Sequence, residues 1–357
     1  MSDFLSEIKN LTNLNGVPGQ EKEVISYVRE KIKNFVNKIE YDNLGSMITY
    51  KGLNGPRILL ASHVDEIGLI VTEITKEGFV KFQTLGGWLS SVMLAQVWQV
   101  HTFKGVLFGV TGSKPPHILS SVEREKIPNI KDLFLDLGLK NKKEAEELGI
   151  RIGDMITPYT EFRVLGNPNF LLSKAMDNRV GVFILIEILK SLKKIPNQLI
   201  GAFTVQEEVG LRGAITSANK SKPSIAIAID TGIAADIPGE LLESEGKILG
   251  KGPQIPVFDY GLVAHKSLRK LVIDIAISNN IPFQQPKPTG GQTDASAIHI
   301  QNEGAASIVV GIPTRYIHSH TSIVHKEDIH NTIKLLSLLI EKLDENKVNE
   351  VLCNNFN

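Results

Sequence analysis

Apolar residues follow one rhythm towards both ends of the chain and a different one in its middle. Near the start, residues 3–10 and 20–38 carry apolar side chains at helical spacing, which predicts two amphipathic helices. Residues 57–62, with the sequence RILLAS, form a short apolar run that is typical of a buried strand. The chain therefore begins as an α/β unit.

Between residues 67 and 165 the helical rhythm is replaced by short β-like runs that glycines and turns separate. The runs lie at residues 67–74, 79–85, 96–103 and 105–112. Residues 123–149 are the exception, because they are charged and partly helical in pattern. Several short strands at close spacing predict a small β-barrel or sandwich.

After residue 166 the α/β rhythm returns. Residues 178–194 predict a long helix with a basic C-terminal end. Further helices are predicted at 210–220, 265–280 and 327–343, and strands at 199–205, 224–230 and 305–312. We therefore predict an α/β domain built from residues 1–66 and 166–357, interrupted by a β-rich domain at residues 67–165.

Composition narrows the class of protein without indicating its chemistry. The 357 residues include 39 Lys and Arg against 39 Asp and Glu, so no overall charge attracts nucleic acid or an anionic membrane. A single cysteine, Cys353, allows no internal disulfide. The sequence lacks both a signal-peptide pattern and a run of 18 apolar residues. We therefore expect a cytoplasmic globular protein with neither nucleic acid nor membrane as a partner.

Polar residues gather where the predicted strands end. In open α/β sheets the carboxyl ends of the strands converge on one crevice. Carboxylates crowded there repel one another, and bound dications relieve that repulsion. Mixed imidazole and carboxylate ligands suit zinc, cobalt or manganese better than calcium or magnesium. The residues concerned are His63, Asp65, Glu207, Glu208, Asp230 and His318 after strands, and Asp177 before the long helix.

Taken singly, these residues have ordinary structural explanations, such as a core histidine, a solvated acidic pair or a helix cap. Two spacings favour a site. His63 and Asp65 share a face of an extended segment, so Asp65 can hold one ring nitrogen and leave the other for a metal. Glu207 and Glu208 are adjacent and suit different tasks, one as a ligand and one as a general base.

Six motifs in order resemble the tetrahedral aminopeptidase family, also known as glutamyl or deblocking aminopeptidases and as cellulase-M-like proteins. That family comprises dinuclear co-catalytic metallopeptidases, and the resemblance covers nearly the whole chain. The motifs are SHVDEIG (62–68), SKAMDNRVG (173–181), TVQEEVGLRGA (204–214), AIDTG (228–232), GGQTDA (290–295) and PTRYIHS (313–319).

The resemblance implies a fold and a role for each residue. It implies a mixed sheet with helices on both faces and a barrel-like insertion that serves oligomerisation and access to the site. His63 and Asp230 would bind one metal, Glu208 and His318 the other, and Asp177 both. Asp65 would orient His63, and a cis peptide would follow Asp177. The implied reaction is removal of N-terminal residues from peptides by a bridging metal-bound hydroxide, with Glu207 as general base and two divalent ions, zinc, cobalt or manganese, in each subunit.

Four further residues are candidates for substrate contact or support of the ligands: Thr293, Asp294, Arg315 and His320. His320 shares a face with His318 on an extended segment, and the family pattern favours His318 as the ligand. Family members form large homo-oligomers, often dodecamers, so a homo-oligomer is expected.

Two alternatives to an aminopeptidase remain. One is another hydrolase on the same scaffold, a deacylase or other amidohydrolase, or a glycosidase, although a glycosidase normally needs no two-metal site. The other is a non-catalytic metal-binding or assembly protein, which would require a broken site.

Overall fold

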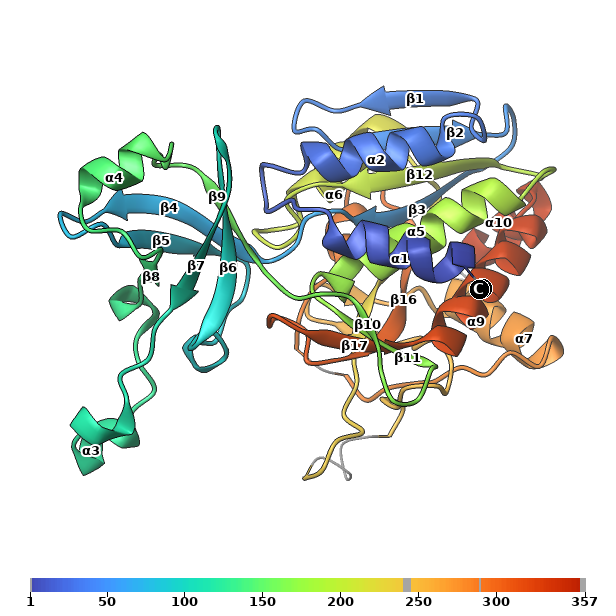
Figure 1. Cartoon of the computed structure of the whole chain (residues 1–357). Coiled ribbons are helices and arrows are strands. Elements are labelled where there is room, and N and C mark those ends of the chain that lie inside the picture. Colours follow the sequence, from blue (N-terminus) through green and yellow to red (C-terminus); the bar gives the residue numbers. More distant parts are fainter. Residues whose placement is uncertain (1, 240–244, 289, 354–357) are drawn as a thin grey trace.

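The computed structural model of the chain describes residues 2–239, 245–288 and 290–353. Figure 1 shows two bodies side by side, a large α/β domain and a smaller barrel. The α/β domain contains the first and last helices of the described chain, and the barrel is made from one internal segment. The predicted α/β class with an inserted β-barrel-like domain is confirmed.

A nine-stranded mixed sheet forms the centre of the α/β domain, in the order β1-β2-β12-β3-β13-β16-β17-β11-β10. The four central strands, β12, β3, β13 and β16, are parallel, and the strands on both sides of them are antiparallel. The strands are β1 Lys38–Tyr41, β2 Met47–Lys51, β3 Arg57–His63, β10 Arg163–Val164, β11 Phe170–Ser173, β12 Gln198–Thr204, β13 Ile225–Ile233, β16 Ala306–Arg315 and β17 Ser322–His325.

Helices cover both faces of this sheet, because alternate side chains of each buried strand point to opposite faces. Leu60 and Ile227 pack into the larger cluster with α1, α2, α5, α7, α9 and α10, whereas Leu59 and Ala226 pack against α6 and α8. The helices are α1 Ser2–Asn13, α2 Lys22–Ile32, α5 Met176–Ser191, α6 Arg212–Ser221, α7 Lys266–Ser278, α8 Asp294–Ile298, α9 Lys326–Lys342 and α10 Glu345–Cys353.

The second body is a closed barrel in the strand order β4-β5-β8-β7-β6-β9. Its own core includes Leu69, Val80, Trp98 and Ile156. Of the two predicted architectures, barrel and sandwich, the barrel is therefore the observed one.

The elements of the barrel domain are β4 Gly68–Ile74, β5 Val80–Leu85, β6 Gln96–Thr102, β7 Gly105–Thr111, β8 Leu135–Asp136, β9 Met155–Pro158, α3 Ser121–Arg124 and α4 Lys142–Glu147. The short elements of the chain are the 3-10 turns Ser90–Val92, Pro116–Ile118 and Ile130–Asp132, and the hairpin of β14 (Phe258–Asp259) and β15 (Leu262–Val263).

Two predicted helices have different limits. The helix predicted over 20–38 ends at Ile32. Lys38, the last residue of that predicted range, instead begins strand β1, and both Lys38 and Tyr41 are exposed at the sheet edge. The long helix predicted over 178–194 begins two residues earlier, at Met176, and ends at Ser191. Its second and third residues, Asp177 and Asn178, have non-helical backbone angles, so Asp177 lies at an irregular first turn.

Strand register brings the predicted site residues to one edge of the sheet. Thr204 of β12 pairs with His63 of β3, so residues 205–208 continue from the same edge as residues 64–66. Asp230 pairs with Gly311, four residues before the end of β16. The carboxyl ends of the four parallel strands therefore face the region between the sheet and the barrel.

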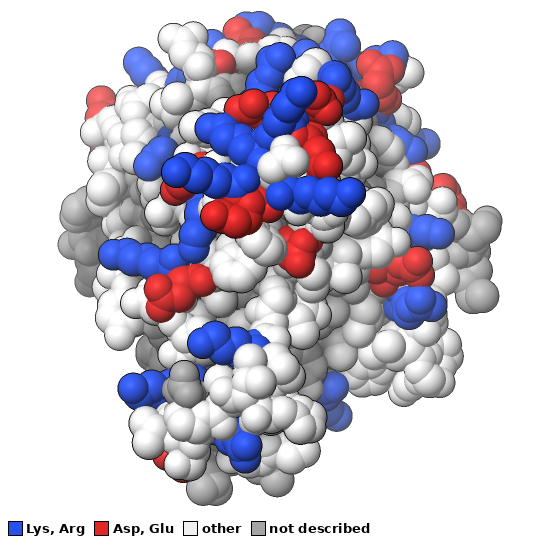
Figure 2. Space-filling view, turned by 60° about the vertical axis from the view of Figure 1, so that its left-hand side comes forward, with Lys and Arg blue, Asp and Glu red and all other residues white. Residues whose placement is uncertain are grey.

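Acidic and basic side chains lie intermixed on the face that carries the barrel, and the lower part of that face is largely uncharged (Figure 2). Neither sign of charge forms a continuous patch in this view. None of the helices in the described residues is both long and apolar enough to cross a membrane.

Candidate metal centre

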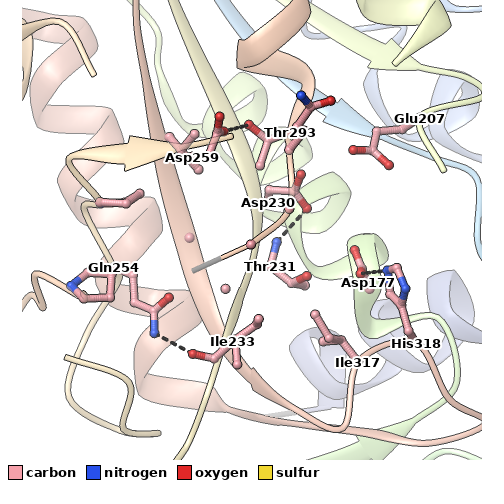
Figure 3. A pocket seen from close by; sticks show the side chains of 18 of the residues that line it. Asp177, Glu207, Asp230, Thr231, Ile233, Gln254, Asp259, Thr293, Ile317 and His318 are labelled. Atoms are coloured by element: carbon pink, nitrogen blue, oxygen red, sulfur yellow. Dashed lines mark hydrogen bonds and ion pairs between the residues drawn. The ribbon is translucent and has the colours of Figure 1, made fainter. Parts of the chain in front are cut away.

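Four carboxylates and two histidines line one cleft of about 530 Å³ at the carboxyl edge of the sheet. They come from five separate segments of the chain. Figure 3 shows the carboxylates of Asp177, Glu207 and Asp230 turned towards the same space, with His318 beside Asp177. The six residues are His63, Asp177, Glu207, Glu208, Asp230 and His318.

Two clusters of ligand atoms share Asp177. His63 Nε2 lies 3.3 Å from Asp177 Oδ1 and 3.6 Å from Asp230 Oδ1. His318 Nε2 lies 3.5 Å from Glu208 Oε2 and 3.6 Å from Asp177 Oδ2. Each cluster has its ligand atoms within 4.8 Å of one another. One oxygen of Asp177 thus faces each cluster, as a bridging carboxylate between two ions must.

Main-chain carbonyls hold both histidines. His63 Nδ1 lies 3.0 Å from the carbonyl oxygen of Asp65, and His318 Nδ1 lies 2.9 Å from that of Gly87. An Nδ1–H donated to a carbonyl leaves the Nε2 lone pair for a metal. Gly87 comes from the barrel segment, and a side chain there would press on the His318 ring, since an added Cβ would lie 2.9 Å from Nδ1.

The carboxylate of Asp65 has a different partner from the one that its spacing predicts. Its Oδ1 is 3.7 Å from His63 Nδ1, beyond hydrogen-bond distance. Instead Oδ1 accepts the main-chain N–H of Glu207 and Oδ2 that of Glu208, both at 3.1 Å. The extended segment turns after His63, so the Asp65 carbonyl meets the ring and the Asp65 carboxylate meets the neighbouring strand end.

Burial and crowding shift the pKa values of His63, Asp177, Glu207 and Glu208. Burial, reinforced by the charges of Asp230 and Glu208, raises the pKa of Glu207 well above its usual range. Burial and the charge of Asp177 raise the pKa of Glu208 in the same way. Burial alone would lower the pKa of His63, but Glu207 and Asp177 outweigh it and raise that pKa. Burial also opposes ionisation of Asp177, whose pKa His63 nevertheless lowers.

Cations lie behind the cleft but are committed elsewhere. Lys174 Nζ contacts both carboxylate oxygens of Glu66, at 2.6 and 2.8 Å. Arg179 donates to the carbonyls of Leu11, Leu14 and Val64 and lies 3.5 Å from Glu66 Oε1. Among the described residues, the four cleft carboxylates form ion pairs within 4 Å only with the two histidines.

This donor set fits divalent cations. Imidazole and carboxylate side chains converge, no Lys or Arg of the described residues lies within 4 Å of the four carboxylates, and Asp177 faces both clusters. The Asp177–Asn178 peptide bond is cis, in agreement with what the family resemblance implies.

The four remaining candidates lie in different surroundings. Thr293 lines the cleft and donates to Asp259 at 3.2 Å. Asp294 is buried and accepts from Thr204 at 2.5 Å, while its other oxygen has no hydrogen-bond partner among the described residues. Arg315 forms a bidentate pair with Asp236 at 2.8 and 2.6 Å instead of facing the cleft.

His320 is separated from the ligands by aromatic packing. Its ring centroid lies 4.2 Å from that of Trp98 and 5.6 Å from that of Trp88, both in the barrel domain. The structure therefore brings His318 to the clusters and places His320 between the two domains.

Sequence reasoning missed Glu21, Glu66, Gly87, Lys174 and Arg179. Three of them lie inside the motifs, Glu66 in SHVDEIG and both cations in SKAMDNRVG. A charged residue next to a predicted ligand could have indicated a residue that supports the site. Glu21 and Gly87 reach the site across long stretches of sequence and have no local signal.

The fold and the clusters of His and carboxylate ligands together indicate a metal-dependent hydrolase. The chain belongs to the M42 glutamyl aminopeptidase family, whose model matches residues 45–335. It is accordingly an aminopeptidase, and the family implies divalent metal ions at the site.

Similar proteins cover almost the whole chain. A glutamyl aminopeptidase of Lactococcus lactis subsp. cremoris is 35% identical, over 98% of this chain and 99% of that protein. The TET aminopeptidase of a marine sediment Thaumarchaeota archaeon has a TM-score of 0.94 at 41% identity, covering 98% of this chain and 99% of that one. The Pyrococcus horikoshii TET1 peptidase, described as assembling into a tetrahedron or a large octahedral shell, has a TM-score of 0.85 at 34% identity, covering 96% and 100%.

Proposed function

We propose that this aminopeptidase removes N-terminal residues with two divalent cations per subunit and Glu207 as general base. The observation that carries the proposal is the pair of ligand clusters that share Asp177. His63 and Asp230 would hold one cation, Glu208 and His318 the other, and Asp177 both. Zinc or cobalt suits these ligands best, and manganese is a third candidate.

Bound cations of this kind polarise a scissile carbonyl and lower the pKa of a bound water. Glu207 would serve in proton transfer, since it belongs to neither of the two clusters that share Asp177; it also groups with His63 and Glu208, its Oε2 lying 4.0 Å from His63 Nε2. The Glu207 carboxylate would take the proton of the attacking water and return it to the leaving amine. One carboxylate can serve both steps, since the base that takes up the proton is the acid that returns it.

The same site would favour chain ends. The free α-amine of a peptide would meet the metal site or a nearby carboxylate, whereas an internal peptide bond offers no amine there. Cleavage would therefore be limited to the first residue.

We also propose that the barrel domain joins copies of this chain into a homo-oligomer. Large apolar side chains are exposed on it, among them Phe103, Phe108 and Ile152. Exposed apolar side chains of this size mark interaction surfaces when they are grouped, and Figure 2 shows a largely uncharged area on this side. Light scattering should give a mass of many subunits, and a stable monomer would contradict this part of the proposal.

The decisive test combines Glu207→Gln with metal analysis. The variant should keep two metal ions per chain and lose most of its turnover of aminoacyl-anilides and short peptides, about 10²-fold or more. Glu303→Gln, at an exposed position, is the matched control. Rates like those of the wild type in Glu207→Gln would exclude Glu207 as the base.

A substrate panel separates the alternatives. It contains aminoacyl-anilides, an N-acyl amino acid and a cellulose oligomer, each assayed after reconstitution with zinc, cobalt or manganese. Turnover of the N-acyl amino acid alone would indicate a deacylase. An active protein free of metal would overturn the dinuclear mechanism.

A further inference from the structure

Three consecutive main-chain N–H groups at the end of β12 are bound by two buried carboxylates. Glu207 and Glu208 donate to Asp65, as described above. The N–H of Gln206, immediately before them, donates to Glu21 Oε1 at 3.1 Å. Each of the three residues therefore has its N–H hydrogen-bonded to a carboxylate, and the two carboxylates come from different parts of the chain.

Gln206 needs such a partner because of its backbone. Strand β12 ends at Thr204, so the Gln206 N–H lies beyond the strand ladder, and the residue has a positive φ of 58°. A buried N–H without an acceptor is costly, about 1–3 kcal/mol. The left-handed turn at Gln206 also sets the direction in which the chain enters Glu207.

Glu21 does not cap the helix that follows it. It is the residue before helix α2, where a side chain commonly caps the helix, yet its carboxylate makes no capping bond. Instead Oε1 accepts from Gly19 at 2.6 Å and from Gln206 at 3.1 Å. The side chain is nevertheless buried, with Glu21 only 4% exposed, which is unusual for an acid that forms no ion pair within 4 Å among the described residues.

We propose that Glu21 is a positioning residue for Glu207, acting through the N–H of Gln206. Glu21 does not line the cleft, so it touches neither the substrate nor the ligand clusters. The inference rests on the proposed role of Glu207 as base. Asp65 alone would still hold the N–H groups of Glu207 and Glu208, so loss of the Glu21 oxygen loosens the turn without removing a ligand.

The test compares Glu21→Ala, Glu21→Gln and Glu23→Ala. Glu21→Ala should lower kcat about 10- to 100-fold with KM changed less than about twofold, since a displacement near 1 Å can cost that much. Glu21→Gln keeps an oxygen that can accept from Gln206 and should stay within about threefold of the wild-type kcat. Glu23→Ala changes an exposed acid in the first turn of the same helix and is the control.

A second readout needs no turnover. Amide hydrogen exchange of residues 205–211, measured on the metal-loaded protein, should become at least about tenfold faster in Glu21→Ala and remain unchanged in Glu21→Gln and Glu23→Ala. Metal content should stay the same in all three variants. Wild-type exchange and kcat in Glu21→Ala would overturn the inference, as would an equal loss of kcat in Glu21→Gln.

The inference and the proposed function can fail separately. If Glu207→Gln is inactive while Glu21→Ala is fully active, only the positioning role is wrong. If Glu207→Gln is as active as the wild type, Glu207 is not the base. Faster exchange in Glu21→Ala would then show that Glu21 stabilises the turn without any role in proton transfer.

Discussion

Replacing Lys174 by methionine tests the buried charge cluster behind the cleft. Lys174 and Glu66 are 3% and 1% exposed, and Nζ contacts both oxygens of the carboxylate at 2.6 and 2.8 Å. Methionine fills a similar volume but leaves the Glu66 carboxylate with Arg179 Nη2, 3.5 Å away, as its remaining cationic neighbour. The perturbation therefore strands a charge without opening a large cavity.

The expected loss in free energy of unfolding is about 3–5 kcal/mol, because removing one partner leaves an uncompensated buried charge. The exposed pair of Lys143 and Glu147, 3.7 Å apart, offers the control: Lys143→Met should cost less than about 1 kcal/mol. The double variant Lys174→Met with Glu66→Gln removes both charges. It should recover more than half of the loss, since the charge that methionine strands is then absent.

Urea unfolding followed by far-ultraviolet circular dichroism measures all four proteins, with metal present and after chelation. The reasoning would be refuted if Lys174→Met lost no more stability than Lys143→Met. It would also be refuted if the double variant were less stable than Lys174→Met, because then the lysine contributes by packing and not by its charge.

Three further outcomes follow from the structure. Chelation should lower the melting temperature, and adding zinc, cobalt or manganese should restore it, because a ligand bound only by the folded chain stabilises it by RT ln(1 + [L]/Kd); calorimetry measures this, and an unchanged melting temperature would contradict it. Burial, helped by the charge of Lys174, lowers the pKa of His101 to about 4. Acidification below about 6.5 therefore favours the unfolded chain, and the stability lost between pH 7 and 5 should be about 2 kcal/mol smaller in His101→Gln, as urea titrations at both pH values can show. Gly181→Ala should cost about 1–3 kcal/mol in the same assay, because its Cβ would collide with Asn178 Oδ1 and lie 2.6 Å from Ser62 Oγ, whereas Gly166→Ala, in open space, should change little.

The central strands were predictable because burial on both faces leaves a continuous apolar run. Residues 57–62 and 224–230, for example, fall largely within β3 and β13, which pair in parallel at the centre of the sheet. Edge elements lack that signal. Strand β1 has exposed ends and follows a helix of similar polarity, so it was absorbed into the predicted helix at 20–38. Two-residue strands such as β10 are too short to show any period.

The site divides in the same way. The proposed ligands could be chosen from sequence because each stands beside a strand or helix end within a motif. Their partners could not, because they are joined by tertiary contacts: Gln206 meets Glu21 from 185 residues away, and His318 meets Gly87 from 231. The prediction for Asp65 differed in its detail for a related reason. Period-two spacing says which face a side chain shares, but not that the chain turns after His63.

The equal numbers of 39 acidic and 39 basic residues conceal an uneven distribution inside the molecule. Lys174 and Arg179 are buried cations of the motif that carries Asp177, and they pair with Glu66 and with main-chain carbonyls. They offset the charge of Glu66 and leave the charge of the cleft unbalanced. Within the described chain, the four cleft carboxylates have only His63 and His318 as ion-pair partners. Two dications would bring a charge of +4 to those four carboxylates. Removing metal ions would therefore leave the cleft carboxylates without their counter-charge. The pair of Lys174 and Glu66 should be unaffected by that removal.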